Sequence, residues 1–161
     1  MKKIIVIGCP GSGKSTFSRA LHRVTGIPLF HLDIMYWNKD KTTVEKSEFH
    51  RRLAEVLQQD QWIIDGNYAS TMQWRLQECD TVIFLDYPAE VCLTGIQQRQ
   101  GKTRSDIPWT DTEEDAEFIS FIKNFSAHSR PRILELLSEY PQKNACIFTT
   151  RAQAEAFLTQ L

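Results

Sequence analysis

Residues 2–16 of the chain read Lys-Lys-Ile-Ile-Val-Ile-Gly-Cys-Pro-Gly-Ser-Gly-Lys-Ser-Thr. Within this stretch, residues 8–15 match the pattern GxxxxGK(S/T) in full, between an apolar run typical of a strand and a run typical of a helix. Gly8, Gly11 and Gly13 allow the backbone to turn tightly and to point its N–H groups inward at an anion. The helix that follows directs the positive end of its dipole at the same point. Residues 8–15 are therefore predicted to form a phosphate-binding loop, called the phosphate loop below.

Two side chains of the phosphate loop carry the predicted chemistry. Lys14 can reach the β- and γ-phosphates of a nucleotide as a point charge, and the hydroxyl of Ser15 can face Mg²⁺. The predicted nucleotide contacts in this region are Gly8, Pro10, Gly11, Ser12, Gly13, Lys14, Ser15 and Thr16. The alternative is a glycine-rich turn that only caps a helix. Cys9 fills a variable position of the motif, as a redox-sensitive thiol or as a passive small residue.

Composition and charge restrict the class of protein. The chain has 161 residues, 42% of them hydrophobic, which fits one domain over residues 1–161. A formal net charge of −1 argues against a nucleic-acid partner, which usually needs a clearly basic face. The four cysteines form neither a CxxC pair nor a zinc pattern, so we expect reduced thiols in a cytoplasmic protein. No apolar stretch has the length of a signal-peptide core or a membrane span, and we expect a monomer or homodimer.

Short apolar runs alternate with longer amphipathic stretches, which is typical of βα units around a parallel sheet. The predicted strands are residues 2–8, 28–32, 61–65, 81–86 and 144–149. The predicted helices are residues 14–25, 46–59, 69–78, 88–99, 114–138 and 151–160. Gly26 is expected to cap the first of these helices. We expect the helix at 114–138 to break near residues 129–131, because Pro131 disfavours helical backbone at the residue before it.

Three predicted strands end in an aspartate, namely Asp33, Asp65 and Asp86. The carboxyl ends of parallel strands share one edge of the sheet with the phosphate loop, where ligands of open α/β sheets bind. Asp86 and Asp65 are rival candidates for holding Mg²⁺, directly or through water, and Asp65 can instead hold an acceptor. The alternative for Asp86 is an N-cap of the helix that follows Pro88. Carboxylates beside nucleotide phosphates are expected where Mg²⁺ or an acceptor lies between them.

Phosphoryl transfer also needs positive charge on the oxygens of the transferred group. Arg99, Arg104 and Arg130 are the predicted catalytic arginines, and a solvated basic face is the alternative for each of them. Residues 100–113 lack periodicity, and residues 100–115 are predicted to form a lid that excludes water, called the lid segment below. The acidic run at residues 111–115 is expected to cap the helix after it.

These motifs together resemble the adenylate-kinase-like P-loop kinases, and more closely the bacterial group known as DNA topology modulation proteins. The resemblance covers almost the whole chain. It rests on the phosphate loop and on four further stretches: His-Leu-Asp at 31–33 with Trp37, Trp-Ile-Ile-Asp-Gly-Asn-Tyr at 62–68, Asp-Thr-Val-Ile-Phe-Leu-Asp at 80–86, and Arg99 with Arg130-Pro131.

The resemblance implies a three-layer α/β/α P-loop NTPase fold with a five-stranded parallel sheet in the order 2-3-1-4-5, a short lid, and use of ATP with Mg²⁺. It also implies that Asp33 faces the acceptor, that Asp65 lies near Mg²⁺, and that Arg99 and Arg104 are lid arginines. Adenine is implied to lie near Arg104 and the loop 149–151, so that Arg151 contacts the nucleotide.

One departure from the family pattern concerns the acceptor side. Adenylate kinases follow Asp-Gly with Phe-Pro-Arg, and that arginine helps to hold the phosphate of the acceptor. Here residues 67–69 are Asn-Tyr-Ala, and Arg75 is either a substitute for that arginine or an ordinary surface arginine. The segment between the second and third strands is also short, which indicates a smaller acceptor site than that of a true adenylate kinase.

The residues after the second strand suggest an acceptor pocket. Asp33 can orient an acceptor hydroxyl or take its proton, and Tyr36 and Trp37 either stack on a ring or pack in the core. His31 shares a strand face with Asp33 and is read as structural. The sequence therefore predicts an ATP-dependent kinase of a small molecule, such as a nucleoside, a nucleotide or another metabolite. The alternative is a regulatory or DNA-topology-associated P-loop protein without kinase activity.

Overall fold

The computed structural model describes residues 1–110 and 115–161. Within these ranges five parallel strands form one sheet in the order β2-β3-β1-β4-β5, which confirms the expected order. The strands are β1 (Lys3–Gly8), β2 (Leu29–His31), β3 (Trp62–Asp65), β4 (Thr81–Leu85) and β5 (Asn144–Phe148). Each predicted strand is present, and each is shorter than predicted by one to two residues.

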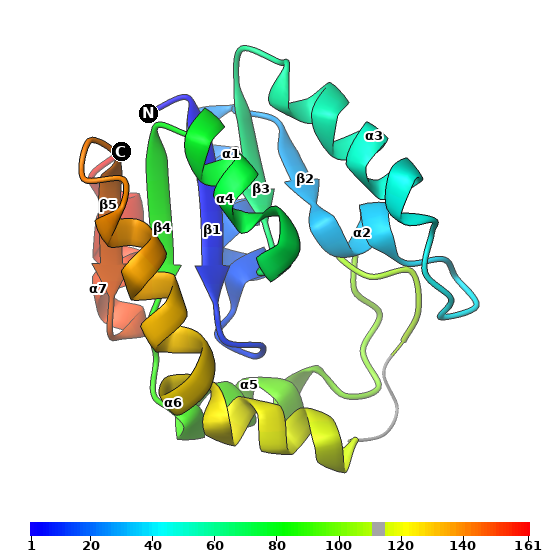
Figure 1. The fold of residues 1–161 in the computed structure, drawn as a ribbon. Coiled ribbons are helices and arrows are strands. Elements are labelled where there is room, and N and C mark those ends of the chain that lie inside the picture. Colours follow the sequence, from blue (N-terminus) through cyan, green and yellow to red (C-terminus); the bar gives the residue numbers. More distant parts are fainter. Residues whose placement is uncertain (111–114) are drawn as a thin grey trace.

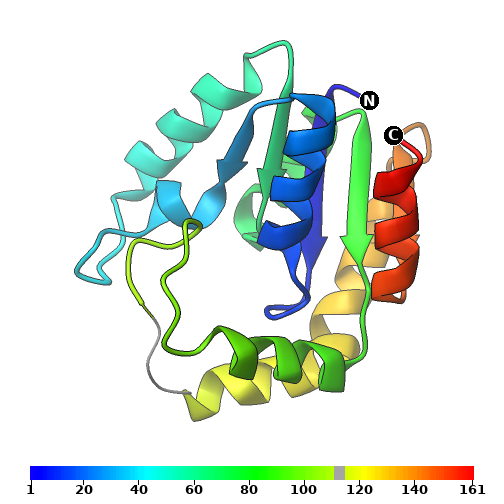
Figure 2. The same ribbon diagram turned by 180° about the vertical axis from the view of Figure 1, so that it is seen from behind.

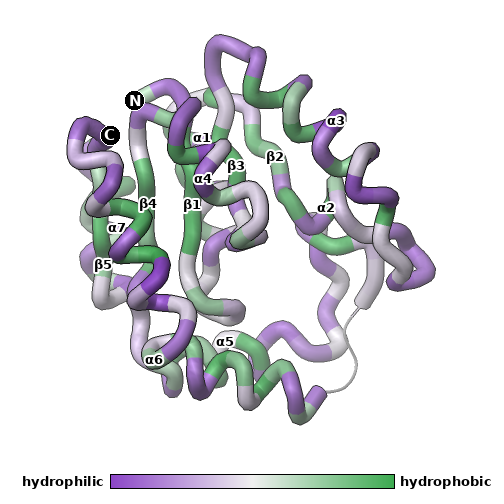
Figure 3. Tube along the Cα trace, in the orientation of Figure 1, coloured by the Kyte–Doolittle hydropathy of each residue, from purple (hydrophilic) through white to green (hydrophobic). Residues whose placement is uncertain are grey.

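The apolar runs form strands because helices cover both faces of the sheet. Ile4 to Ile7 in β1 and Val82 to Phe84 in β4 have no exposed surface. Figure 3 shows these two strands as continuous hydrophobic stretches in the middle of the molecule. The edge strand β5 is more exposed, and Ile147 keeps 43% of its surface in solvent.

Seven helices lie in the described residues and form the two outer layers. They are α1 (Lys14–Thr25), α2 (Leu32–Tyr36), α3 (Lys46–Leu57), α4 (Ala69–Glu78), α5 (Ala89–Arg99), α6 (Ala116–Ser138) and α7 (Arg151–Thr159). Figure 1 shows α4 and the second half of α6 in front of the sheet, and Figure 2 shows α1 and α7 on the opposite face. The predicted three-layer α/β/α arrangement is therefore confirmed.

Gly26 and Pro131 test the helix ends that were predicted from glycine and proline. Gly26 ends α1 in a left-handed conformation, and its N–H donates to the carbonyl of His22 at 2.7 Å, as expected. The predicted break near residues 129–131 is wrong, because α6 continues through Pro131. Figure 1 instead shows a bend between the part of α6 beside α5 and the part beside the sheet. A proline lacks the N–H and collides with the preceding turn, so it bends a helix that packing on both sides preserves.

The short helix α2 was not predicted. It follows β2 directly, and it is too short for a periodic pattern to reveal it. Its two buried residues, Leu32 and Met35, attach it to the core and leave Asp33 on another face. No helix in the described ranges has the length and apolarity that a bilayer crossing requires.

Candidate active site

Hydrogen bonds to its own carbonyl groups stabilise the phosphate loop. Gly13 begins α1 in a left-handed conformation with φ of 93°, and the N–H of Ser12 donates to the carbonyl of Cys9 at 3.0 Å. Nζ of Lys14 donates to the carbonyl oxygens of Gly8 at 2.9 Å and Cys9 at 3.2 Å. Burial lowers the pKa of the Lys14 ammonium, and the charges of Asp33 and Asp65 oppose that shift. The loop thus presents a cation at the N-terminus of a twelve-residue helix, which is an arrangement suited to phosphate.

The loop lies directly on α5, and two glycines make this possible. Gly11 has φ of +83°, and a Cβ atom there would lie 2.0 Å from the carbonyl oxygen of Cys92. A Cβ atom on Gly95 in α5 would lie 2.1 Å from the carbonyl oxygen of Gly11. The prediction from sequence included Gly11 and missed Gly95. A single glycine within a helical stretch does not show which part of the protein packs against it.

The turn after β3 holds the start of the phosphate loop. The N–H of Gly8 donates to Oδ1 of Asn67 at 3.1 Å, and Nδ2 of Asn67 donates to the carbonyl of Gly8 at 2.8 Å. Asn67 therefore bonds both backbone groups of Gly8. Sequence reasoning had noted Asn67 only as a departure from the family pattern.

The guanidinium of Arg75 holds the same turn, residues 66–68, in place. Its side chain is fully buried and donates to the carbonyl oxygens of Gly66 at 3.0 Å, of Asn67, and of Tyr68 at 3.2 Å. Burial lowers its pKa to about 10. Both interpretations of Arg75 from the sequence are corrected here, since it is neither a surface arginine nor directed at an acceptor.

A cavity of about 820 Å³ opens between the phosphate loop, α2, the 66–68 turn, α5 and the lid segment. Its size is within the range of small-molecule sites. Ten of the predicted site residues line it: Pro10, Gly11, Gly13, Lys14, Ser15, Thr16, Asp33, Arg99, Arg104 and Arg151. Five others do not line it: Gly8, Ser12, Asp65, Asp86 and Arg130.

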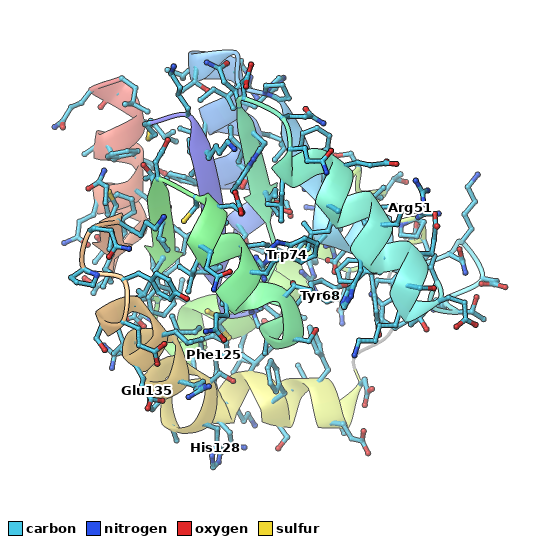
Figure 4. All side chains as sticks on the ribbon, turned by 45° about the horizontal axis from the view of Figure 1, so that its top comes forward. Arg51, Tyr68, Trp74, Phe125, His128 and Glu135 are labelled. Atoms are coloured by element: carbon cyan, nitrogen blue, oxygen red, sulfur yellow. The ribbon has the colours of Figure 1, made fainter. Side chains whose placement is uncertain are left out.

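Asp33 lies at one end of this cavity with an aromatic partner. Oδ1 of Asp33 accepts a hydrogen bond from the hydroxyl of Tyr68 at 2.5 Å. Burial raises the pKa of Asp33, while the Tyr68 hydrogen bond and the Lys14 charge oppose the shift. Figure 4 shows Tyr68 at the start of α4 and beside α3, where its ring packs on Phe49 with centroids 5.5 Å apart. The carboxylate is thus positioned by a side chain that is itself held in the core.

Two tryptophans form the wall next to Asp33. The rings of Trp37 and Trp109 meet edge to face with centroids 5.4 Å apart, and both residues line the cavity. Tyr36 packs against Phe49 and Tyr68 instead, and it does not line the cavity. The rings of Tyr36 and Trp37 are also in edge-to-face contact, with centroids 5.2 Å apart, so Tyr36 packs behind Trp37 and only Trp37 faces the cavity. Trp109, from the lid segment, was not predicted.

The other two strand-end aspartates have side-chain partners away from the cavity. Both carboxylate oxygens of Asp65 lie within 2.9 Å of Nδ1 of His31, which is its register neighbour on β2. Both oxygens of Asp86 accept from Nε of Arg130 at 2.9 Å. Asp86 does not cap α5, whose N-cap is Pro88 without a side-chain hydrogen bond. The sequence did not indicate these two pairs, because it shows that residues share a sheet edge but not which side chains meet.

The lid segment is held against the phosphate loop by a buried carboxylate. Oγ of Ser15 donates to Oδ2 of Asp106 at 2.7 Å. Arg104 contacts the same carboxylate through Nε–Oδ1 at 3.1 Å and NH2–Oδ2 at 2.6 Å. Burial alone would raise the pKa of Asp106, but hydrogen bonds from Arg104 and Ser15 hold it well below its usual range. Asp106 was missed by sequence reasoning, since one acidic residue in an aperiodic loop has no motif around it.

A second contact and a helix cap frame the lid segment. NH1 of Arg19 in α1 donates to Oγ of Ser105 at 3.3 Å. At the far end, Oδ1 of Asp115 accepts from the N–H of Glu117 at 2.9 Å and caps α6, as expected for this residue. The rest of the predicted acidic cap and of the predicted lid, residues 111–114, lies outside the described residues.

The remaining predicted cations surround the phosphate loop. Arg99 lies over the ring of Phe118 at 5.9 Å and lines the cavity. Arg151 begins α7, lies over the ring of Tyr87 at 5.8 Å, and has NH1 3.3 Å from the position of a Cβ on Gly13. Together with Lys14 these groups make one end of the cavity strongly cationic, which suits a polyphosphate.

Oxygen donors in this region suit a hard divalent cation. Ser15 and Asp106 present a hydroxyl and a carboxylate oxygen to the same part of the cavity. Within residues 1–110 and 115–161, no three His, Cys, Asp or Glu side chains gather as a metal cluster. That is compatible with Mg²⁺, which is often held by one or two protein oxygens together with substrate phosphates and water.

Comparisons with known proteins agree with this geometry. No family model matches the chain. Adenylate kinase of Thermotoga maritima is 28% identical over 109 residues, which are 63% of this chain and 49% of that protein. Adenylate kinase of Thermotoga petrophila is 29% identical over 94 residues, 56% of this chain and 42% of that protein. The chain thus spans about half the length of the curated relatives it matches.

Two solved structures share the fold. Shikimate kinase from Acinetobacter baumannii, in complex with shikimate, superposes with a TM-score of 0.65 and 17% identity over 99% of this chain and 90% of that one. Shikimate kinase from Bacteroides thetaiotaomicron gives a TM-score of 0.60 and 21% identity over 98% and 94%. The fold is that of P-loop kinases, and the sequence similarity supports a relationship to adenylate-kinase-like members of that class.

Proposed function

We propose that the chain is a kinase that transfers the γ-phosphate of Mg²⁺-ATP to a small acceptor. One observation carries the proposal: a single cavity joins the phosphate loop, with Lys14, to the half-buried carboxylate of Asp33. Phosphoryl transfer requires these two groups in one enclosed space, with the phosphate at the first and the acceptor at the second. The adenylate and shikimate kinase similarities support the same reaction class.

The roles of the lining residues follow from their charges. Lys14 and the N-terminus of α1 bind the phosphates, and Arg99 and Arg104 stabilise the charge of the transferred group. Arg151, at the start of α7, borders the nucleotide beside Gly13. Mg²⁺, when bound, supplies further neutralisation of the phosphate oxygens. The lid segment excludes water, which would otherwise compete as an acceptor.

Asp33 is the residue that meets the acceptor. Tyr68 orients its carboxylate, so an acceptor hydroxyl at the cavity end would donate a hydrogen bond to it and later release its proton to it. Trp37 and Trp109, whose rings meet edge to face, supply aromatic surface beside it, and Arg75 has its donors occupied by the 66–68 turn. These features favour an acceptor with a hydroxyl group and a planar part. The narrower grouping with DNA topology modulation proteins stays a prediction from the motifs at 31–33 and 62–68.

The test is ADP release from Mg²⁺-ATP by the purified protein, with a panel of nucleosides, nucleoside monophosphates and small hydroxyl metabolites. The proposal predicts that at least one compound of the panel raises ADP release well above the rate with ATP alone. If ATP binds and no compound of the panel raises the rate, the kinase proposal is contradicted and a nucleotide-dependent regulatory role gains support.

A further inference from the structure

Among the described residues, the carboxylate that is hydrogen-bonded to a side chain of the phosphate loop belongs to the lid segment and not to a strand end. Asp106 is only 4% exposed, and its Oδ2 lies 2.7 Å from Oγ of Ser15. Both residues line the cavity. We propose that Asp106, together with Ser15, holds the Mg²⁺ that accompanies the nucleotide, so that the metal is bound partly by the lid. The inference rests on the proposed use of Mg²⁺-ATP.

The other candidate carboxylates are accounted for elsewhere. Asp65 is paired with His31 and Asp86 with Arg130, and neither lines the cavity. Asp106 also has both oxygens bonded, to Arg104 and Ser15, but it lines the cavity. Among the described residues, the aspartates and glutamates that do line it are Asp33, Asp106 and Asp115. Asp33 accepts from Tyr68 at the acceptor end, and Asp115 caps α6. Asp106 is therefore the carboxylate that contacts the phosphate loop.

The geometry of the Ser15–Asp106 pair fits two neighbouring ligands of one Mg²⁺ ion. Oxygens at adjacent corners of an octahedron with metal–oxygen bonds of about 2.1 Å are about 3.0 Å apart. The Oγ–Oδ2 distance of 2.7 Å is about 0.3 Å shorter, so the two oxygens need to move apart only slightly. The metal can therefore enter beside both oxygens with little movement of the backbone, once the hydroxyl hydrogen of Ser15 turns away from Asp106.

Charge gives an independent reason for a cation at this place. A carboxylate beside the phosphate loop repels nucleotide phosphates unless a cation lies between them. Arg104 already neutralises one unit of this charge, but a nucleotide brings several more negative charges. A divalent cation between Asp106 and the phosphates turns the repulsion into attraction. Because Asp106 lies on the lid segment, the same ion couples nucleotide binding to lid closure.

The test compares nucleotide affinity with and without the metal, by isothermal titration of ADP and of a non-hydrolysable ATP analogue in excess Mg²⁺ or in EDTA. The variants are Asp106→Asn and, as a matched control on an exposed loop, Asp60→Asn. Asp106→Asn keeps the size of the side chain and an oxygen that accepts from Ser15, and its melting temperature checks the fold. We expect Asp106→Asn to lose about 10- to 100-fold of the affinity in Mg²⁺ and none in EDTA.

Mn²⁺ in place of Mg²⁺ provides a second readout that does not depend on catalysis. Titration of Mn²⁺ into the ADP complex, followed by electron paramagnetic resonance, is expected to show weaker metal binding in Asp106→Asn and unchanged binding in Asp60→Asn. Weaker metal binding in both experiments supports the inference.

Three results would overturn it. An equal loss of nucleotide affinity in Mg²⁺ and in EDTA means that Asp106 only positions Arg104. If Asp106→Asn binds the nucleotide more tightly than the wild type in EDTA, and Mg²⁺ still raises its affinity as much as in the wild type, Asp106 only repels the nucleotide from the phosphate loop. Loss of the Mg²⁺ effect in Asp86→Asn or Asp65→Asn, but not in Asp106→Asn, places the metal at a strand end. Absence of any nucleotide binding by the wild-type protein would instead contradict the proposed function itself.

Discussion

The phosphate loop and the lid segment line one cavity and touch through Ser15 and Asp106, yet they are held in different ways. The loop is held by its backbone: the side-chain amide of Asn67 bonds both the N–H and the carbonyl of Gly8, and Gly11 approaches Gly95 too closely for a side chain. Side chains hold the lid: Ser15 with Asp106, Arg19 with Ser105, and Trp37 with Trp109. The loop is thus built before ligand binding, whereas the lid can open when a few side-chain contacts separate.

The first prediction concerns the rigid side and has the largest effect. Lys14→Ala removes the cation of the phosphate loop, so we expect acceptor-dependent turnover to fall about 100- to 1000-fold. The fold is retained, because the ammonium contacts only carbonyls of its own loop. Steady-state kinetics and circular dichroism measure the two effects, and Lys123→Ala on the exposed side of α6 is the control. Near-normal turnover in Lys14→Ala would contradict the assignment of the loop.

The second prediction tests the 66–68 turn, which Arg75 holds in place and which bonds the phosphate loop through Asn67. Arg75→Met leaves buried carbonyl oxygens in the 66–68 turn without donors, and we expect the free energy of unfolding to fall by about 3 kcal/mol. The comparison is with Trp109→Ala in the lid segment, which should change it by less than about 1 kcal/mol. Urea denaturation of both variants checks this. Similar losses in the two would mean that the loop and the lid are equally part of the scaffold.

The third prediction isolates the contact between the phosphate loop and α5. Gly95→Ala places a methyl group against the carbonyl of Gly11, and we expect a loss of about 2 kcal/mol in stability. Gly101→Ala is the matched control in the lid segment, because a Cβ there has open space around it. Its loss should stay near the roughly 1 kcal/mol of a left-handed backbone position. Thermal denaturation of the pair decides whether close packing fixes the loop.

The smallest predicted change in stability concerns Asp33, whose half-buried carboxyl has a pKa raised by desolvation. A raised folded-state pKa means that this group favours folding below the unfolded value of about 3.9 and loses that contribution as pH rises through the folded value. Asp33→Asn removes the buried charge, so at pH 7 we expect a gain of about 1 kcal/mol in stability with loss of turnover. Unfolding measured at several pH values should show this gain shrinking toward pH 4. A variant less stable than wild type at pH 7 would refute the prediction.

The difference between the phosphate loop and the lid segment also explains which features could be predicted from the sequence. The strands, their order and the loop were predictable, because buried parallel strands need continuous apolar runs and a phosphate loop needs glycines at fixed spacing. The cavity could be anticipated through Lys14 and Asp33, which begin or belong to the helices that follow the carboxyl ends of β1 and β2. In these regions, a residue's place in a motif or after a predicted strand is enough to locate it in the fold.

The contacts of individual side chains could not be predicted in this way. Asp106 lies 91 residues from Ser15, and Arg130 lies 44 residues from Asp86. No local pattern marks such partners, since only the folded sheet and the path of the lid bring them together. The continuation of α6 through Pro131 has the same origin, because packing against α5 overrides a local preference.

The most direct test of the account follows the γ-phosphate itself. ATP labelled in its γ-phosphate is incubated with Mg²⁺, the acceptor that raises ADP release, and either the wild-type protein or Asp33→Asn. The account predicts that the label moves to the acceptor with the wild-type protein and that Asp33→Asn slows this transfer about 100-fold or more. Label found in inorganic phosphate alone, at the same rate in both proteins, would contradict a kinase with Asp33 at its acceptor site.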